Sequence, residues 1–179
     1  MVKIFATYYN QEERLPTLLA SLKAQTSQNY KLTVCSNADK TIHKVFPLVD
    51  FEKIVTKENT GFWGCKNRVD FISTLDDNDY IINTSAEDYY APTLIEEIEK
   101  GGEDFIYWDL VHHQADYTLL RSSPFITRID WGNFCVKAKF IKNIVINTES
   151  YTADGEAVEE IMKMNPTMRK ISKVLMIKN

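Results

Sequence analysis

Two adjacent carboxylates, Glu87 and Asp88, follow the apolar segment 80–82, which we expect to form a buried strand. A helix is expected over 94–100, because Pro92 precedes it and two glycines follow it. The carboxyl end of such a strand is where open α/β sheets place their ligand chemistry. Mg²⁺ and Mn²⁺ bind oxygen ligands and often use one or two carboxylates plus phosphate oxygens. Taken alone, the pair is better explained as solvated helix-start charge, which the helix dipole favours. The flanking motifs favour the alternative, a metal-assisted phosphate site.

The elements around these acids alternate between strand and helix over the first 100 residues. Strands are expected over 3–7, 32–35, 54–56, 80–84, 105–108, 117–120 and 174–177, and helices over 15–22, 63–74, 94–100, 136–144 and 156–164. This alternation is typical of a doubly wound α/β fold with a central, mostly parallel sheet. We expect one domain over 1–179, with a nucleotide-binding half over 1–100 and an acceptor-binding half over 101–179.

Composition describes an ordinary globular domain. Of the 179 residues, 44% are apolar and 26% are charged, which is enough for a substantial core. The net charge of -4 argues against bulk binding of nucleic acid. After Glu160 the chain carries five cations and no acid. Such a basic segment can meet phosphates or anionic lipid, but it is more often a solvated end.

Three cysteines, Cys35, Cys65 and Cys135, are too few and too widely spaced for a disulfide framework or a zinc site. We expect them to be reduced and mostly buried. Met1 leads directly into an expected strand, so no signal peptide is predicted, and no apolar run reaches membrane-spanning length. A cytoplasmic location is therefore expected.

Four motifs, taken in order, resemble the inverting nucleotide-sugar glycosyltransferases of the GT-A fold, a Rossmann-like three-layer sandwich. They are TYYNQEERL with SLKAQT (7–15 and 21–26), VCSNAD (34–39), NTGFWGCKN (59–67) and SAEDYYAP (85–92). This chain would be a short member. The resemblance implies an enzyme, a hexosyltransferase, that uses a nucleotide sugar.

The first three motifs would bind the donor. By the resemblance, Tyr8 and Tyr9 lie beside the nucleoside, and Asn37, which replaces a family Asp, pairs with a uracil edge. Lys66 replaces a family Arg and would face the diphosphate as a point charge. Read without the resemblance, the tyrosines pack in the core and the glycine-rich loop only precedes a helix.

The fourth motif would hold a metal. The family's first Asp is replaced by Ser85, and Glu87 takes the metal-facing position beside Asp88. The implied cofactor is Mn²⁺ or Mg²⁺. Two later segments would complete the site. By the resemblance, Trp131, Gly132 and Asn133 form the acceptor side, with Trp131 as a sugar platform, although a tryptophan is as often simply buried.

The segment Asp154-Gly155-Glu156 resembles the family's acidic motif, with Asp154 as catalytic base and Glu156 as the second candidate. A helix start also explains these acids without catalysis.

Three functions stay open at this stage. The preferred one is inverting, metal-assisted transfer of a sugar, from UDP-sugar above all, to an acceptor hydroxyl. A catalytically degenerate sugar-nucleotide or carbohydrate-binding module is the alternative, since Ser36, Asn37 and Ser85 replace acids. A nucleotidyltransferase is disfavoured, because the loop over 8–13 lacks glycine. The acceptor is expected to be small, or a second copy or a partner protein completes its site.

Overall fold

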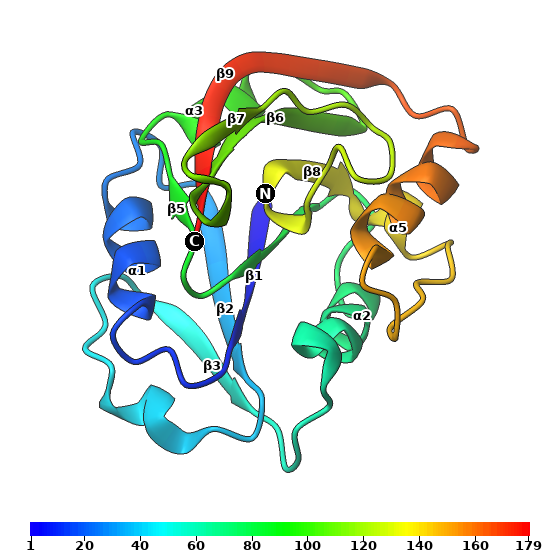
Figure 1. Cartoon of the computed structure of the whole chain (residues 1–179). Coiled ribbons are helices and arrows are strands. Elements are labelled where there is room, and N and C mark those ends of the chain that lie inside the picture. The colour runs from blue at the N-terminus through cyan, green and yellow to red at the C-terminus, as the bar shows by residue number, and fades with distance from the viewer.

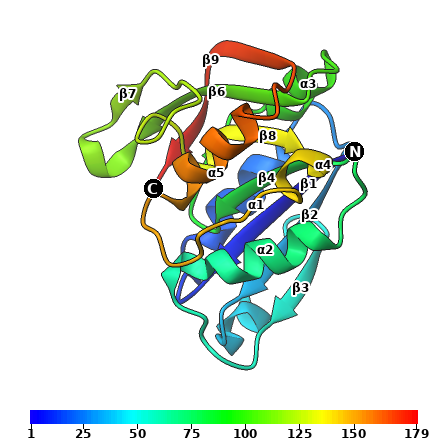
Figure 2. The same cartoon turned by 90° about the vertical axis from the view of Figure 1, so that its right-hand side faces the viewer.

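A curled nine-stranded sheet runs through the molecule, with helices on both faces (Figures 1 and 2). The structure is a computed structural model that describes residues 1–179, apart from the side chain of Gln114. The strands are β1 (Val2–Tyr8), β2 (Tyr30–Ser36), β3 (Phe51–Val55), β4 (Tyr80–Ser85), β5 (Tyr89–Tyr90), β6 (Phe105–His112), β7 (Thr118–Leu120), β8 (Phe134–Lys137) and β9 (Met168–Lys178). The α-helices are α1 (Leu15–Lys23), α2 (Cys65–Ser73), α3 (Leu94–Glu99), α4 (Ala138–Ile141) and α5 (Ala153–Met162). Short 3₁₀ helices are η1 (Lys40–Lys44), η2 (Phe62–Gly64), η3 (His113–Ala115) and η4 (Trp131–Asn133).

The sheet has the order β3-β2-β1-β4-β8-β6-β9-β5, and β7 pairs with β6. The first four strands in this order are parallel, which agrees with the predicted doubly wound arrangement. β8 is antiparallel to both β4 and β6, and β9 then runs parallel to β6. The carboxyl ends of β1, β4 and β9 therefore lie on one side of the molecule, opposite the N-terminus (Figure 2).

Two apolar cores lie on opposite faces of the sheet. Because side chains alternate along a strand, Ile4 enters one core and the next residue, Phe5, enters the other. The first core contains the buried leucines of α1, and the second contains Ile72 of α2 and Val158 of α5. These two layers fix where α2 and α5 begin, and both beginnings reach the carboxyl side of the sheet (Figure 2).

The mostly parallel α/β fold is confirmed, and one predicted element is wrong in type. The segment expected to be a helix over 136–144 begins as the end of strand β8 and becomes helical only over α4. β8 pairs with a neighbour on each side, and its first three residues are buried. Its apolar run therefore lacks the alternation that marks an exposed strand.

Several predicted boundaries also shift. The helix expected from residue 63 begins at Cys65, after the 3₁₀ turn η2, and the third strand begins at Phe51 rather than residue 54. All three cysteines are free and buried, as expected. None of the helices in the described chain combines the length and the apolar character that crossing a bilayer requires.

Candidate active site

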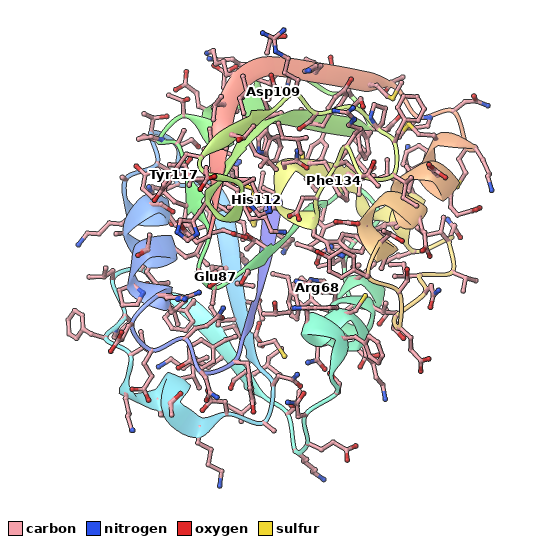
Figure 3. All side chains as sticks on the ribbon, viewed as in Figure 1. Arg68, Glu87, Asp109, His112, Tyr117 and Phe134 are labelled. Atoms are coloured by element: carbon pink, nitrogen blue, oxygen red, sulfur yellow. The ribbon has the colours of Figure 1, made fainter. Side chains whose placement is uncertain are left out.

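Five charged side chains gather at the carboxyl side of the sheet, and we call them the charge cluster. They come from five different elements of the fold: Arg68 in α2, Asp88 after β4, Asp130 before η4, Asp154 in α5 and Lys178 at the end of β9. Each of the four other groups is influenced electrostatically by Asp130. In Figure 3, Arg68 lies towards α2 and Glu87 towards α1, with His112 above and between them. The cluster is where this fold class places its ligand chemistry.

Asp88 is fixed by the tight turn that follows β4. Its Oδ2 accepts hydrogen bonds from the Thr84 hydroxyl at 2.7 Å and from the Ser85 amide at 2.9 Å. Its Oδ1 is buried and has no hydrogen-bond partner among the described residues. Burial, and next the charge of Asp130, raise the pKa of Asp88 to about 7. This carboxyl therefore exchanges its proton near neutral pH.

Asp130 and Lys178 form an ion pair at the centre of the cluster. Asp130 also accepts a hydrogen bond of 3.0 Å from the Gly132 amide and begins η4 as part of a capping box with Asn133. Burial would raise the pKa of Asp130, but the charge of Lys178 lowers it below the ordinary value overall. Asp130 is therefore ionised at neutral pH.

The end of β9 pairs with β6 on one side and with β5 on the other, and this pairing fixes the position of Lys178. In the sheet register Lys178 lies opposite His112 of β6, and Ile177 lies opposite Tyr89 of β5. The side chain of the next residue, Asn179, donates a hydrogen bond of 2.7 Å to the backbone carbonyl of Glu87. The lysine is therefore brought beside the turn that carries Asp88.

Asp154 lies in the first turn of α5 and is only half-buried, so a ligand can reach it. Its Oδ1 accepts a 2.7 Å hydrogen bond from the Gly155 amide. Burial, and next the charge of Asp130, raise the pKa of Asp154 to about 6. A carboxylate with this pKa is ionised at neutral pH, yet it is a stronger base than an ordinary Asp.

Arg68 is the buried cation of α2, whereas the predicted Lys66 is exposed. The Arg68 guanidinium donates hydrogen bonds to the Trp63 carbonyl at 2.9 Å and to the Thr7 hydroxyl at 3.1 Å. A weaker contact of 3.5 Å reaches the Thr84 carbonyl. Arg68 therefore ties the start of α2 to the ends of β1 and β4.

The predicted metal ligands are not brought together. Glu87 forms an ion pair with Arg14 at the start of α1, and the Ser85 hydroxyl accepts a 3.4 Å hydrogen bond from Gln11. Within the part of the chain that the structure describes, no three His, Cys, Asp or Glu side chains gather to hold a metal ion. Asp88 contributes one unpartnered oxygen, and the charge of Lys178 acts on this carboxyl. Of the predicted pair, Asp88 alone keeps a buried carboxylate oxygen without a hydrogen-bond partner, whereas Glu87 is paired with Arg14.

The three residues predicted to contact the nucleoside lie in different environments. Tyr8 is buried in the core, Asn37 is hydrogen-bonded within the protein, and Tyr9 is exposed. Tyr8 is buried in the first core, and its hydroxyl shares a 2.7 Å hydrogen bond with Thr41. Asn37 donates to Asn59 at 2.6 Å and accepts from the Thr60 amide at 2.9 Å, so it holds the following loop. Tyr9 is 51% exposed and is free to contact a base or ribose.

The predicted acceptor residues are engaged inside the protein. Trp131 is 8% exposed and packs against Phe134, with ring centroids 5.9 Å apart. Asn133 is fully buried and donates a 3.0 Å hydrogen bond to the Trp108 carbonyl. A Cβ on Gly132 would lie 2.4 Å from the Met176 methyl carbon. This turn therefore positions Asp130 rather than presenting a surface.

Glu156, the second candidate for the base, also has a local partner. Its carboxylate accepts hydrogen bonds from Ser150 and, at 2.8 Å, from Thr152. These hydroxyls lower the pKa of Glu156. Glu156 therefore holds the loop before α5 through these hydrogen bonds. Of the two candidates for the base, Asp154 is the one that belongs to the charge cluster.

An exposed aromatic pair lies at the start of α2. Trp63 is 67% exposed and Tyr151 is 83% exposed, and their rings meet edge to face with centroids 5.5 Å apart. The pair joins the loop before α2 to the loop before α5. Four consecutive residues here, 61–64, have positive φ angles of 65°, 41°, 50° and 72°. Phe62 and Trp63 are therefore held in a left-handed backbone that such residues avoid, which is typical of functional loops.

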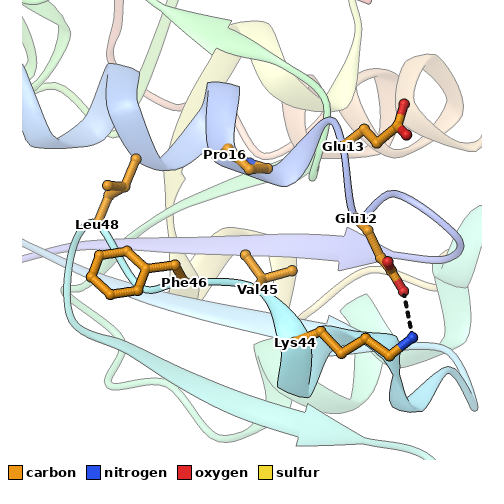
Figure 4. A pocket seen from close by; sticks show the side chains of 7 residues that line it. All are labelled: Glu12, Glu13, Pro16, Lys44, Val45, Phe46 and Leu48. Carbon is orange, nitrogen blue, oxygen red and sulfur yellow. Dashed lines mark hydrogen bonds and ion pairs between the residues drawn. The ribbon is translucent and has the colours of Figure 1, made fainter.

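Two hollows lie away from the cluster. One, of about 390 Å³, is bounded by Pro16, Val45 and Phe46, with an ion pair between Glu12 and Lys44 at its rim (Figure 4). The other, of about 540 Å³, lies at the amino ends of the strands, beside Lys3 and Asp79. Neither is lined by a residue of the charge cluster.

Sequence reasoning missed three residues of the cluster: Arg68, Asp130 and Lys178. A signal existed for Asp130, because an Asp before Trp-Gly-Asn can cap a short helical turn. For Lys178 the only signal was its place in a basic segment that could meet phosphates, and this did not distinguish it from the other four cations.

Comparison with known proteins shows the fold. No protein-family model and no curated protein matches the sequence. Residues 1–349 of TarS from S. aureus match with a TM-score of 0.77 and 13% identity, over 99% of this chain and 60% of that one. TarS has been solved with UDP and with UDP-GlcNAc. The mannosyltransferase PcManGT from Pyrobaculum calidifontis, in complex with GDP-Man and Mn²⁺, matches with a TM-score of 0.71 and 12% identity, over 99% of this chain and 56% of that one. The chain thus has the GT-A fold and spans 60% or less of the length of these proteins.

Proposed function

We propose that this GT-A-fold protein is a glycosyltransferase that moves a sugar from a nucleoside diphosphate to an acceptor hydroxyl, with inversion. The observation that carries the proposal is Asp154, a half-buried carboxylate near one buried cation, Arg68, and one partly exposed cation, Lys178, at the carboxyl side of the sheet. A helix-start acid without a catalytic role would be solvated and would keep an ordinary pKa. The pKa of Asp154 is instead raised to about 6 by burial and by Asp130.

In this mechanism Asp154 is the general base. Its carboxylate accepts the proton of the acceptor hydroxyl as the oxygen attacks the anomeric carbon. The bond between that carbon and the phosphate oxygen breaks, and its electron pair stays on the diphosphate. Attack from the face opposite the diphosphate inverts the anomeric centre.

The donor would be a uridine diphosphate sugar. TarS, which shares the fold, binds UDP and UDP-GlcNAc, whereas PcManGT binds GDP-Man. Tyr9 is exposed beside the end of β1, where a base or ribose would lie. Asn37 keeps one N–H of its amide for a base edge after its bonds to Asn59 and Thr60. Lys66 is exposed in the first turn of α2 and would face the diphosphate of the donor.

The acceptor would lie against Trp63 and Tyr151 rather than against Trp131. Aromatic faces are common platforms for sugar rings, and these two are exposed next to the loop that leads to Asp154. The acceptor hydroxyl could come from a small molecule or be presented by a second copy of the chain. Gel filtration with and without UDP distinguishes these two cases.

A nucleotide-binding module without turnover is the second candidate. It is favoured by the internal bonds of Asn37 and by the ion pair of Glu87 with Arg14. A divalent ion is not part of the proposal, because the predicted ligands are not brought together.

One experiment tests the function. Purified protein is incubated with a panel of UDP- and GDP-sugars, and release of the nucleotide is measured, with and without sugar acceptors. The anomeric configuration of the product is then read by NMR. Asp154→Asn should keep nucleotide affinity and lower transfer by roughly two to four orders of magnitude.

Glu160→Gln is the matched control, since Glu160 lies on α5 and pairs only with exposed Lys163. Nucleotide binding without turnover in the wild-type protein would favour the binding module. Normal transfer by Asp154→Asn would show that Asp154 is not the base.

A further inference from the structure

Lys178 places a cation at the end of β9, beside the turn that carries Asp88. The turn over 85–88 follows β4, and in the proposed function it lies beside the donor diphosphate. Asn179 ties the end of β9 to this turn through the Glu87 carbonyl. We propose that the Lys178 ammonium serves as a built-in cation that stabilises the leaving diphosphate, so that the enzyme needs no divalent metal. This inference rests on the proposed glycosyltransferase function.

Hydrogen-bond counting supports a ligand role for Lys178. An ammonium group has three N–H donors. Asp130 is the one acceptor that Lys178 bonds among the described residues. The Lys178 side chain is 30% exposed, so the remaining donors can be reached by an incoming phosphate oxygen.

The charge state of Lys178 fits the same role. Burial would lower its pKa, but the charge of Asp130 raises the pKa above the ordinary value of a lysine. The ammonium therefore stays protonated throughout the reaction. As the bond from the anomeric carbon to phosphate breaks, the electron pair and negative charge go to the phosphate oxygen. Lys178 would donate a hydrogen bond to that oxygen, which is electrostatic stabilisation where charge develops.

The second cation of the cluster is not available for this task. Arg68 is 5% exposed, and its guanidinium donates to Trp63, Thr7 and Thr84. Its Nε–H has no partner among the described residues, but the guanidinium is buried, so a ligand cannot reach it. Lys178 is the cluster cation with free donors and exposure.

The alternative cation, a divalent metal, would find only Asp88 free among its predicted ligands. Ser85 carries no charge, and Glu87 is paired with Arg14 on the other side of the turn. A divalent ion would also add two positive charges beside Lys178 and Arg68, where only Asp88, Asp130 and Asp154 supply negative charge. Like charges at such distances repel strongly in a partly buried site.

Calorimetry with UDP and the full chain tests the inference. Affinity is measured in chelator and in Mn²⁺ for wild-type protein, Lys178→Met and Lys178→Arg. The wild-type protein should bind equally in both conditions. Lys178→Met should bind at least about tenfold more weakly, the size expected for one hydrogen bond to a charged group. Lys178→Arg should recover most of the affinity, because a guanidinium keeps the positive charge and has N–H donors to spare for phosphate.

Two variants serve as controls. Lys173→Met changes another β9 lysine that pairs with an acid, Glu97, away from the cluster, and should bind UDP normally. The double variant Lys178→Met, Asp130→Asn removes both charges of the ion pair, so no buried carboxylate is left without its partner. Thermal melting checks that this variant folds. This double variant should show the same loss of affinity as Lys178→Met.

The outcomes separate the two proposals. Binding that requires Mn²⁺ in the wild-type protein, or normal affinity in a folded Lys178→Met variant, would overturn the role of Lys178 and leave the glycosyltransferase proposal standing. Failure to bind any nucleotide in either condition would overturn both.

Discussion

At the scale of single residues, the chemistry of the site depends on three carboxyl groups with different pKa values. The pKa of Asp130 is held low by Lys178, whereas burial raises that of Asp154 to about 6 and that of Asp88 to about 7. The reason for the difference is that Asp130 has the ion pair and the other two lie in its field. One group can therefore act as a base while its neighbour holds a proton.

The pH dependence of transfer should report Asp154. A base works only when deprotonated, so kcat/KM should rise with pH through about 6 and level off above it. The measurement is kcat/KM for the nucleotide sugar from pH 5 to pH 8. In Asp154→Asn the residual kcat/KM should no longer rise with pH through about 6. A profile that is flat between pH 5 and 7 in the wild-type protein would contradict the assignment.

Asp88 should make the folded protein less stable as pH rises. Its folded pKa of about 7 is above the ordinary value of 3.8, so the folded state holds a proton that the unfolded chain has lost. This contribution to stability is complete below pH 4 and is lost as pH rises through 7. Asp88→Asn should therefore match wild-type stability near pH 4 and exceed it at pH 8.

The expected gain in the free energy of unfolding at pH 8 is on the order of 2 to 4 kcal/mol. Asn can keep both hydrogen bonds to Oδ2, from Thr84 and Ser85, through its single carbonyl oxygen. Urea unfolding at the two pH values measures the difference. A variant that is equally destabilised at both would show that the carboxyl form is needed for the fold.

At the scale of elements, α5 depends on a close approach to the loop before η4. A Cβ on Gly155 would lie 2.6 Å from the Cα of Ile126, which is backbone and cannot turn aside. Gly→Ala inside a helix normally stabilises by about 1 kcal/mol. Gly155→Ala should instead destabilise the protein by about 1 to 3 kcal/mol through overpacking.

The same substitution should lower transfer, because it displaces the neighbouring Asp154. Gly102→Ala is the control, since a Cβ there meets nothing within 4 Å. Thermal melting and transfer assays on the two variants give the comparison. A stabilised Gly155→Ala variant would mean that α5 does not pack against this loop as described.

Trp63 has an unfavourable left-handed backbone, and we expect its side chain to contribute to acceptor binding rather than to stability. Glycine adopts the left-handed backbone without the cost that a Trp bears at φ 50°. Trp63→Gly should therefore leave the free energy of unfolding within about 1 kcal/mol of wild type. It should raise the KM for the acceptor by roughly tenfold, the loss expected for one aromatic contact.

Phe46→Gly removes another exposed aromatic, which is 77% exposed and lies by the hollow of Figure 4. It should leave the KM for the acceptor unchanged. Steady-state kinetics with the acceptor found in the panel assay provides the measurement. An unchanged KM in Trp63→Gly would remove the aromatic pair from the acceptor side.

At the scale of the whole molecule, the parallel front of the sheet was predictable because its signals are local. Buried runs such as that of β4, followed by polar turns, identify strands wherever they lie in the chain. β8 was misread because a strand buried between two neighbours loses its alternation. The GT-A fold itself came from the order of four motifs, and similar folds in solved structures confirm it.

The site was less predictable, because its contacts are long-range. Asp154 could be singled out by its place in a motif. The burial of Trp131 and the ion pair of Glu87 with Arg14 depend on packing between distant segments. The pairing of Asp130 with Lys178 joins residues 48 positions apart, and no local pattern marks it.

The contacts that hold the end of β9, namely the Asp130–Lys178 ion pair and the hydrogen bond from Asn179 to Glu87, have a consequence for the order of folding. The strands β1 to β4 can pair as soon as they are made, but Asp130 has no counter-charge until Lys178 arrives at the end of β9. Because long-range pairing is slow and an unpaired carboxylate resists burial, we expect the newly made chain to acquire its core first. On the proposed function, binding of a nucleotide sugar is therefore expected only after β9 has joined the sheet.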